Sequence, residues 1–469
     1  MANKYNLSKK HILLTILFAV YMSEYMVSLI IMDQGAYVFS GMGEILHYFK
    51  MPALAVGFLL FPLSRRLGTG IKTGRILLLI SNIVCFIGMI SLSGLFFTLN
   101  FPVYITSCVI SLLSLGFLGG AAYYSFGMGF VNHPYLGRLS GLAGAAAFII
   151  QMTAQYLIPT AVTMLILLLA GFFFTAHVTL ASGDRFDWMF DEPLEYAGKG
   201  DPSLPGTKMI TSGIAAMMLL YLICGLTDTI LVSMNFAGDM GMYAWPRFFG
   251  AVGYLLGGCL SDLGRRKWLL LSAFCVTILC IPLPLILSEG YIISGTCLYY
   301  VIVVAQIVFL NVFFWELAPR TSRPELWTGM SRILSCLAVL TLPLFSSASV
   351  MTDIILEVFF AVAVILCIAL GGYIPQKTTE IEGSISVSDP SEAPDPFQEF
   401  AEIHGLTPRE KDFFILLIES DDDVQAIASN MNISPRTVYR HISSIYEKTG
   451  TASRYALIRY FFQLQGKTN

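Results

Sequence analysis

Polar side chains that can read DNA gather on one face of a predicted helix near the end of the chain. Within residues 434–448, the apolar residues Val438, Ile442 and Ile445 recur at the spacing that buries one face of a helix. The opposite face then carries Arg436, Tyr439, Arg440, Ser443 and Ser444. Arginine can donate two hydrogen bonds to guanine, and hydroxyl groups can reach bases or phosphates. These residue types at this spacing indicate nucleic-acid recognition.

Neighbouring segments have the signals needed to position this helix. Thr407 can cap a helix, the proline after it suits the first helical position, and Glu410 completes a capping box. We therefore predict helices over about 408–419, 424–431 and 453–463 beside the DNA-reading helix. A helix held across a second helix by a short turn is the helix-turn-helix arrangement.

The charge of this segment is balanced. Residues 400–469 contain eight Lys or Arg and eight Asp or Glu. A domain without net positive charge has little general attraction to the phosphate backbone, so we expect a single copy to bind DNA weakly. Periodicity alone leaves open a helical adaptor that contacts protein instead of DNA.

Residues 406–457 resemble the LuxR-type, or GerE-type, helix-turn-helix. The shared residues are Leu406-Thr407-Pro408-Arg409-Glu410, Ile427-Ala428, Ile433-Ser434, Thr437-Val438, His441, Ile445, Lys448, Gly450 and Arg454. The resemblance implies that the third helix enters the major groove. The chain departs from the family at Tyr439, where lysine is usual, and at Thr449, where leucine is usual.

Site residues follow from the outward face and the resemblance together. The DNA-binding residues are expected to be Ser434, Arg436, Thr437, Tyr439, Arg440, His441, Ser443, Ser444 and Lys448. The family role of the last helix is to join two heads. By position, this dimer contact falls to Arg454, Leu457, Ile458 and Phe461.

The preceding 370 or so residues have the composition of a membrane protein. The whole chain is 56% hydrophobic and only 13% charged, with mean hydropathy +0.71, whereas soluble chains carry about 25% charged residues. Residues 103–129 and 139–176 contain no Asp, Glu, Lys or Arg. Because a span needs about 20 apolar residues and must satisfy its own backbone groups, we predict an all-α bundle of membrane helices.

We predict twelve spans. They cover residues 11–32, 45–64, 75–95, 102–127, 136–158, 160–181, 209–232, 243–262, 268–288, 291–316, 328–348 and 353–374. With residue 1 inside, the inner segments hold seventeen Lys or Arg, and the outer segments hold only Lys50 and Arg247. This bias places both termini in the cytoplasm of a cell whose inner membrane holds the bundle.

The layout divides the chain into five parts. Two six-helix halves, 1–181 and 209–374, flank a cytoplasmic loop over 182–208. A Ser-, Pro- and acid-rich linker over 375–399 joins them to the head, 400–469. Two six-helix halves are the layout of the major facilitator superfamily, which the membrane part resembles.

A loop signature strengthens this resemblance. The run from Gly258 to Lys267 contains Asp262 followed by Gly-Arg-Arg, similar to the superfamily's inner-loop signature but one residue shorter. In the first half, Ser64 stands near the place of the aspartate. In that superfamily the aspartate and arginine help to lock the two bundles, so the degenerate first copy argues against an active transport cycle while leaving the fold intact.

Glycines at helical spacing could bring spans into close contact. They are Gly137, Gly141 and Gly144 in the fifth span, and Gly250, Gly253 and Gly257 in the eighth. Small residues let backbones approach in lipid, and ordinary packing is the alternative explanation.

A few polar side chains within the spans are candidates for a ligand site. Glu24 lies inside the first span, where a carboxylate costs roughly 2.5–3.5 kcal/mol and is usually paired or faces a cavity. We hypothesise a site in which Glu24 opposes Arg247. The residues assigned to it are Glu24, Tyr21, Gln151, Gln155, Asp228 and Arg247. The alternative is an internal salt bridge with residues that snorkel to the interface.

No pattern in the chain indicates catalysis. The nine cysteines all lie in predicted spans without a Cys-x-x-Cys pair, so they are expected to be small apolar residues and not a disulfide frame or zinc site. No Ser-His-Asp, metal or phosphate-binding constellation stands out. We therefore expect no catalytic residue, no metal, no cofactor and no enzyme activity.

The whole chain resembles the membrane-bound LuxR-type regulators of anaerobic bacteria, in which such a bundle is thought to sense small molecules. This resemblance implies a multipass transcription regulator whose bundle binds an unidentified small molecule. Its head would bind promoter DNA, as a homodimer. The alternative is a facilitator-type transporter with an appended regulatory head.

Overall fold

A computed structural model gives the structure of the chain. It describes residues 9–36, 38–39, 43–67, 70–94, 100–130, 133–157, 161–181, 221, 245–263, 269–278, 291–321, 323–339, 396–419, 424–431, 433–451 and 453–468. Every regular element in these ranges is a helix. The chain forms two compact units, one mainly of residues 11–372 and the other mainly of residues 373–469.

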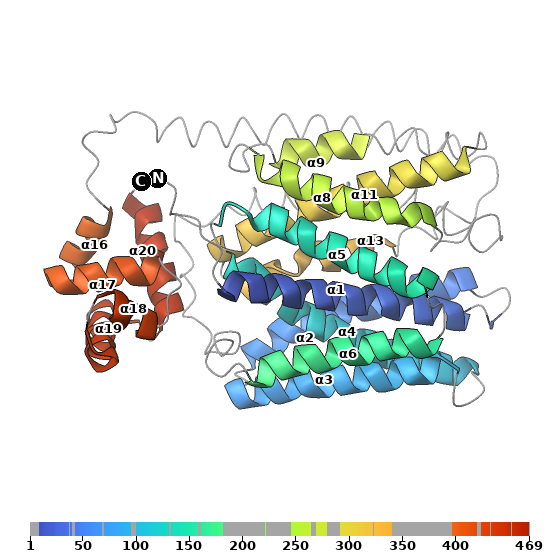
Figure 1. Ribbon diagram of the computed structural model, residues 1–469, viewed down its shortest axis with the longest axis horizontal. Coiled ribbons are helices and arrows are strands. Elements are labelled where there is room, and N and C mark those ends of the chain that lie inside the picture. Colours follow the sequence, from blue (N-terminus) through green and yellow to red (C-terminus); the bar gives the residue numbers. More distant parts are fainter. Residues whose placement is uncertain are drawn as a thin grey trace. The chain divides into compact units, whose positions relative to one another are not determined.

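The first unit is a bundle of long helices that run side by side (Figure 1). They are α1 (Lys9–Ala36), α2 (Gly43–Arg66), α3 (Ile71–Leu92), α4 (Phe101–Gly129), α5 (Leu136–Leu157), α6 (Ala161–Ala181), α8 (Phe249–Ser261), α9 (Leu269–Ile278), α11 (Ile292–Leu317) and α13 (Met330–Val339). Short turns of helix precede or join some of them: η3 (Trp245–Phe248), η5 (Ala318–Arg320) and α12 (Pro324–Trp327).

These helices occupy ten of the twelve predicted spans. The predicted spans over 353–374 and, apart from Tyr221, over 209–232 lie outside the described residues. Among the helices described, α1, α3, α4, α5 and α11 are long and apolar enough to cross a membrane. The expectation of a polytopic helical membrane protein is confirmed at this level.

The two halves meet along α5 and α8, where glycines remove the side chains between the backbones. A Cβ atom on Gly141 would lie 2.4 Å from the carbonyl oxygen of Tyr254, and one on Gly258 would lie 2.7 Å from that of Gly137. The glycine spacing of both helices therefore serves close backbone approach. On its other side, α8 meets α11, where a Cβ atom on Gly253 would lie 2.5 Å from the carbonyl oxygen of Val301.

Asp262 stabilises the same contact between α5 and α8. It follows α8, and its carboxylate accepts hydrogen bonds from the backbone N–H groups of Gly137 (2.9 Å) and Arg138 (2.8 Å) in the first turn of α5. The first N–H groups of a helix have no partner within the helix, so a carboxylate there satisfies them and opposes the helix dipole. The aspartate of the loop signature thus links one half to the other. The Gly-Arg-Arg that follows it lies outside the described residues.

The second unit is the head, and its described residues form five helices. They are α16 (Pro396–Ile403), α17 (Pro408–Glu419), α18 (Val424–Asn430), α19 (Pro435–Thr449) and α20 (Arg454–Thr468). The last four match the predicted helices. The capping box at Thr407 and the cap at Ser434 are confirmed, since Thr407 N–H donates to Glu410 and Ser434 accepts from the N–H of Thr437.

The first of these helices was not predicted. The expected linker runs to residue 399, but α16 begins at Pro396 and packs on the head. Phe400 is buried and stacks on Phe414 with ring centroids 4.4 Å apart, and Phe397 stacks on Phe461 at 4.9 Å. The core that results holds Phe400, Phe413, Phe414, Leu417, Ile427, Ala428, Val438, Ile442, Ile445, Leu457 and Phe461.

Candidate nucleic-acid interface

One face of α19 presents polar side chains to solvent. Arg436, Tyr439, Arg440 and Ser443 are all exposed, and Tyr439 keeps 59% of its surface accessible. The opposite face, with Val438, Ile442 and Ile445, is buried in the head's core, as the periodicity predicted. Within the described residues, no hydrogen bond or ion pair engages the side chains of Arg436 or Arg440. Their donors are available to another molecule.

Ser434 and Thr437 lie at the start of the same helix. The Ser434 hydroxyl accepts from Thr437 N–H at 3.2 Å and lies 2.8 Å from the Thr437 hydroxyl. Gly450 ends the helix in the left-handed conformation, with φ of +66°. A helix with both ends capped in this way holds its exposed side chains at fixed positions.

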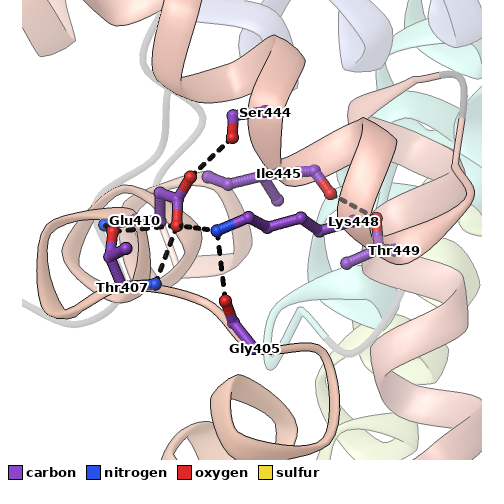
Figure 2. A network of polar contacts seen from close by, with 7 residues as sticks. All are labelled: Gly405, Thr407, Glu410, Ser444, Ile445, Lys448 and Thr449. Carbon is purple, nitrogen blue, oxygen red and sulfur yellow. Dashed lines mark hydrogen bonds and ion pairs between the residues drawn. The ribbon is translucent and has the colours of Figure 1, made fainter.

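A buried carboxylate ties α19 to α17. Figure 2 shows Glu410 at the centre of this network, with Thr407, Ser444 and Lys448 directed toward it. Its Oε2 accepts from Lys448 Nζ (2.7 Å) and from Thr407 N–H (2.7 Å), and its Oε1 accepts from the Ser444 hydroxyl (2.6 Å). Lys448 Nζ also donates to the carbonyl of Gly405 at 3.1 Å.

This network changes the role of two predicted DNA contacts. Ser444 was predicted on the outward face and Lys448 was predicted to bind DNA by the family resemblance, but both side chains turn toward Glu410. Burial raises the pKa of Glu410, and the hydrogen bonds from Lys448, Ser444 and Thr407 outweigh it, lowering the pKa to about 2. The carboxylate is therefore charged at neutral pH, and its hydrogen bonds hold α19 against α17.

His441 also faces inward. Its ring stacks on Phe413 with centroids 4.7 Å apart and an angle of 17° between the planes. The side chain is half-buried, so its position supports α19 against α17 and does not place it on the exposed face.

The residues assigned to a contact between two heads mostly serve the fold of one. Leu457 and Phe461 are 0% and 1% exposed in the head's core. Arg454 donates to the backbone carbonyls of Leu417 (2.8 Å) and Leu416 (3.4 Å) at the end of α17. Ile458 is half-buried and keeps some accessible surface.

Within the membrane unit, Glu24 does not oppose Arg247. Glu24 is 2% exposed and faces α6, where Thr175 donates to its Oε1 at 3.2 Å. Its Oε2 has no hydrogen-bond partner among the described residues. The guanidinium of Arg247 lies over the rings of Phe148 (5.4 Å) and Tyr300 (5.9 Å). The hypothesis of a facing pair is wrong because the two side chains have different surroundings.

The other residues of that hypothesis are scattered. Gln151 is fully buried in α5 and donates to Gln155 at 2.9 Å. Tyr21 is buried in α1 and packs edge-on against Tyr123, 6.4 Å away. Asp228 lies outside the described residues.

The sequence did not indicate that two cations would lie inside the bundle. Lys50 was counted as an outer basic residue, but it is 4% exposed and forms an ion pair with Asp33 of α1. Arg332 was counted as an inner basic residue, but its guanidinium lies 4.3 Å above the ring of Tyr25. The only signal in the sequence was how far each of these two residues lies from the end of its predicted span.

Metal and thiol chemistry find no site in the described part of the chain. It contains no group of three or more His, Cys, Asp or Glu placed to hold a metal ion. Its six cysteines are free thiols; Cys85, Cys108 and Cys336 are buried as expected, whereas Cys259 and Cys275 are exposed on the outside of their helices.

Comparison with known proteins agrees with both units. Residues 404–461 match the family of bacterial regulatory proteins described as the luxR family. The human organic anion transporter MFSD10 (TETRAN) is 15% identical, with a TM-score of 0.51, covering 78% of this chain and 99% of its own. A bacterial homologue of the iron transporter ferroportin, in its outward-facing state, is 16% identical, with a TM-score of 0.50, covering 80% and 100%.

No curated protein matches the chain. At these identities, the two transporters show the fold of the membrane unit alone. The chain joins a membrane unit with the fold of major-facilitator transporters to a DNA-binding domain of the LuxR family of bacterial regulators.

Proposed function

We propose that the protein is a membrane-embedded one-component transcription regulator. In this proposal the bundle binds a small molecule, and the head binds promoter DNA through the exposed face of α19. The observation that supports it is the pair Arg436 and Arg440, which project from a doubly capped, internally braced helix and have no polar partner in the described head. Guanidinium groups held in this way fit the edges of guanine in the major groove.

We further infer that the bundle lies in the inner membrane with both termini in the cytoplasm. The seventeen-to-two distribution of Lys and Arg supports this orientation. The head would then meet DNA on the cytoplasmic side, as a homodimer on paired half-sites. The protein acts by binding and not by catalysis.

A transporter with an appended head is the second candidate. The major-facilitator fold supports it, since the similar solved structures are transporters for an organic anion in one case and related to an iron transporter in the other. Uptake measured in vesicles that contain a variant without the head distinguishes the two. Transport at a rate independent of the head favours the second candidate.

The first candidate is tested by selecting DNA with the full-length protein. The purified protein is incubated with sheared genomic DNA, and the retained fragments are sequenced. Wild type is expected to enrich discrete fragments, while the double variant Arg436→Ala, Arg440→Ala loses them, since each good base contact contributes about 1–3 kcal/mol.

A matched control removes an arginine elsewhere in the head. Arg409 is exposed on α17, a different helix from α19. Its guanidinium lies 3.6 Å from the carboxylate of Asp412. Arg409→Ala is expected to enrich the same fragments as wild type. Unchanged enrichment by the double variant at equal protein abundance would rule out α19 as the DNA-reading helix.

A further inference from the structure

Among the described residues of the bundle, one positive charge has no carboxylate partner. Arg332 of α13 is half-buried, and its guanidinium lies 4.3 Å over the ring of Tyr25 in α1. Among the described residues, no Asp or Glu forms an ion pair with it. Glu24, one turn from Tyr21 on α1, turns toward Thr175 of α6 instead. Charged side chains inside a membrane protein are usually paired, so we expect the Arg332 guanidinium to bind an anionic group.

Aromatic side chains from both halves surround this charge. Tyr21 lies one turn before Tyr25 on α1, and its ring packs edge-on against Tyr123 with centroids 6.4 Å apart. Tyr123 of α4 packs against Trp315 of α11 with ring centroids 5.7 Å apart. We call Tyr21, Tyr25, Tyr123, Trp315 and Arg332 the Arg332 cluster. The four aromatic residues are each less than a tenth exposed.

Two rings of the Arg332 cluster pack against glycines of α4. A Cβ atom on Gly119 would lie 2.2 Å from the Tyr21 hydroxyl, and one on Gly127 would lie 2.2 Å from Cδ1 of Trp315. Any larger residue at either position would displace the ring. The backbone of α4 is therefore fitted to the Arg332 cluster, beyond general packing of apolar helices.

The cluster contains hydrogen-bond donors that have no partner among the described residues. Nε1 of Trp315 is buried and has no hydrogen-bond partner among the described residues. Arg332 carries five N–H donors and no acceptor atom. The preceding residue, Ser331, donates to Asn311 of α11 at 2.5 Å, which fixes α13 against α11 beside the cluster.

We propose that the Arg332 cluster binds the anionic group of an organic ligand with a planar, aromatic or similarly apolar body. A carboxylate or sulfonate would supply the acceptors that Arg332 and Trp315 lack, and the tyrosine and tryptophan rings would pack against the planar body. The cluster joins α1 and α4 of the first half to α11 and α13 of the second, so an occupant contacts both halves. This inference names the ligand class of the proposed sensor and rests on that proposal.

The test compares anions with neutral molecules of the same shape. Thermal unfolding of the full-length protein in neutral detergent is followed with benzoate, indole-3-acetate and naphthalene-1-sulfonate, and with the corresponding amides. At least one anion is expected to raise the unfolding temperature while its amide does not. Arg332→Gln is expected to weaken that binding by about thirtyfold or more.

Two further variants keep the test decisive. Arg75 is a half-buried arginine of α3 outside the cluster, and Arg75→Gln is expected to bind the anion as wild type does. Trp315→Phe keeps the ring but removes its N–H, so it serves if Arg332→Gln does not fold, and it too is expected to bind more weakly. Equal effects of anion and amide, or unchanged binding by Arg332→Gln, would overturn the proposal.

A lipid phosphate has the same chemistry as a free anion. The measurement is therefore repeated in phosphatidylcholine nanodiscs with and without phosphatidylglycerol. Loss of anion binding only with phosphatidylglycerol supports an anion site filled by a headgroup, and binding in both supports a free ligand. Because the experiment contains no DNA, failure of promoter binding leaves this result intact, while anion binding without any reporter response sinks only the proposed sensing.

Discussion

Glu410 is a single carboxylate on which the orientation of the recognition helix depends. It is 5% exposed and accepts hydrogen bonds from one backbone and three side-chain donors. Ser444 and Lys448 come to it from α19, so the carboxylate sets how α19 lies on α17. A buried charge of this kind stabilises only while its donors remain, and losing one side leaves the other unsatisfied.

Replacing Glu410 by glutamine is expected to destabilise the head by about 1–3 kcal/mol at pH 7. The pKa of Glu410 is lowered to about 2 in the folded head from an ordinary value of 4.5. Its stabilising contribution is therefore complete above about pH 5 and is lost as the pH falls toward 2. Urea unfolding at several pH values measures this, and Glu410→Gln should lack that part of the acid sensitivity. An identical pH profile in both proteins would refute it.

Glu24 should behave differently because no cation pairs with it among the described residues. Glu24→Gln is expected to leave the amount of protein in the membrane equal or higher, since no partner charge is left behind. Asp33→Asn is the matched control. It removes one partner of the buried ion pair with Lys50, and the amount should fall. Immunoblots of membranes measure both. A larger loss with Glu24→Gln than with Asp33→Asn would contradict this.

At the level of residues, the sequence predicted what is local. The capping box at Thr407 and the buried face through Val438 follow from spacing within one helix. It did not predict that Ser444 and Lys448 would turn to Glu410, because that contact joins residues 34 and 38 positions apart. The sequence also did not predict which helix Glu24 faces. Helix α1 is apolar on all sides, so no polar stripe indicates which side of it is turned toward solvent or toward a given neighbour.

Among the elements, α16 extends the head beyond the matched family domain. The family match begins at residue 404, after α16 has ended, but Phe397 and Phe400 of α16 pack on Phe414 and Phe461. The sequence concealed this helix because its eight residues follow a stretch rich in serine, proline and acidic residues. Composition there favours a linker, and only the two phenylalanines indicate packing.

Phe400→Ala is expected to destabilise the head by about 3–5 kcal/mol, because a fully packed ring leaves a cavity. Gln398→Ala is the control on the same helix, since Gln398 is exposed and its side chain bonds, among the described residues, to Glu402 and Lys411 at the surface. Denaturant unfolding of residues 394–469 compares the two. Similar stability of both variants would show that α16 is not part of the core.

The close contact between α5 and α8 leads us to predict the effect of a substitution at Gly141. Gly141→Ala places a methyl group 2.4 Å from a backbone oxygen of α8, which must then move away. We expect a loss of about 1–3 kcal/mol, typical of overpacking. Gly70→Ala adds a methyl where nothing lies within 4 Å and should change nothing. Thermal unfolding of the full-length protein in detergent measures both, and equal values would contradict the close approach.

For the whole molecule, the sequence predicted the architecture better than the contacts. The span expected over 102–127 is observed as Phe101–Gly129, and the head lies where its motifs placed it. Hydropathy identifies spans because each must be apolar over a bilayer's thickness. It does not say which spans meet, so the position of Arg332 over Tyr25 could not be foreseen.

At this scale, joining two heads should tighten DNA binding. One head presents a single α19 and has balanced charge, so it is expected to bind weakly. Fusing residues 394–469 to a dimeric coiled coil raises the effective concentration of the second head to the millimolar range. Binding to enriched fragments, measured by electrophoretic mobility shift, should strengthen by about 100-fold or more. Equal affinity of the fused dimer and the single head would contradict paired half-sites.

In the proposed function, the ion pair between Lys448 and Glu410 would also shorten the time that the head spends on non-specific DNA. With Lys448 engaged, Arg436 and Arg440 are the cations on α19 without a partner in the described head. On non-specific DNA, where these two arginines read no base, they can each neutralise one phosphate. Each phosphate neutralised contributes about −0.9 to the slope of log affinity against log salt, so the slope there would be shallow, near −2. Such a head releases non-specific DNA quickly. A regulator held in a membrane, as proposed, cannot slide along the chromosome, so rapid release would let its head sample each segment of DNA that passes.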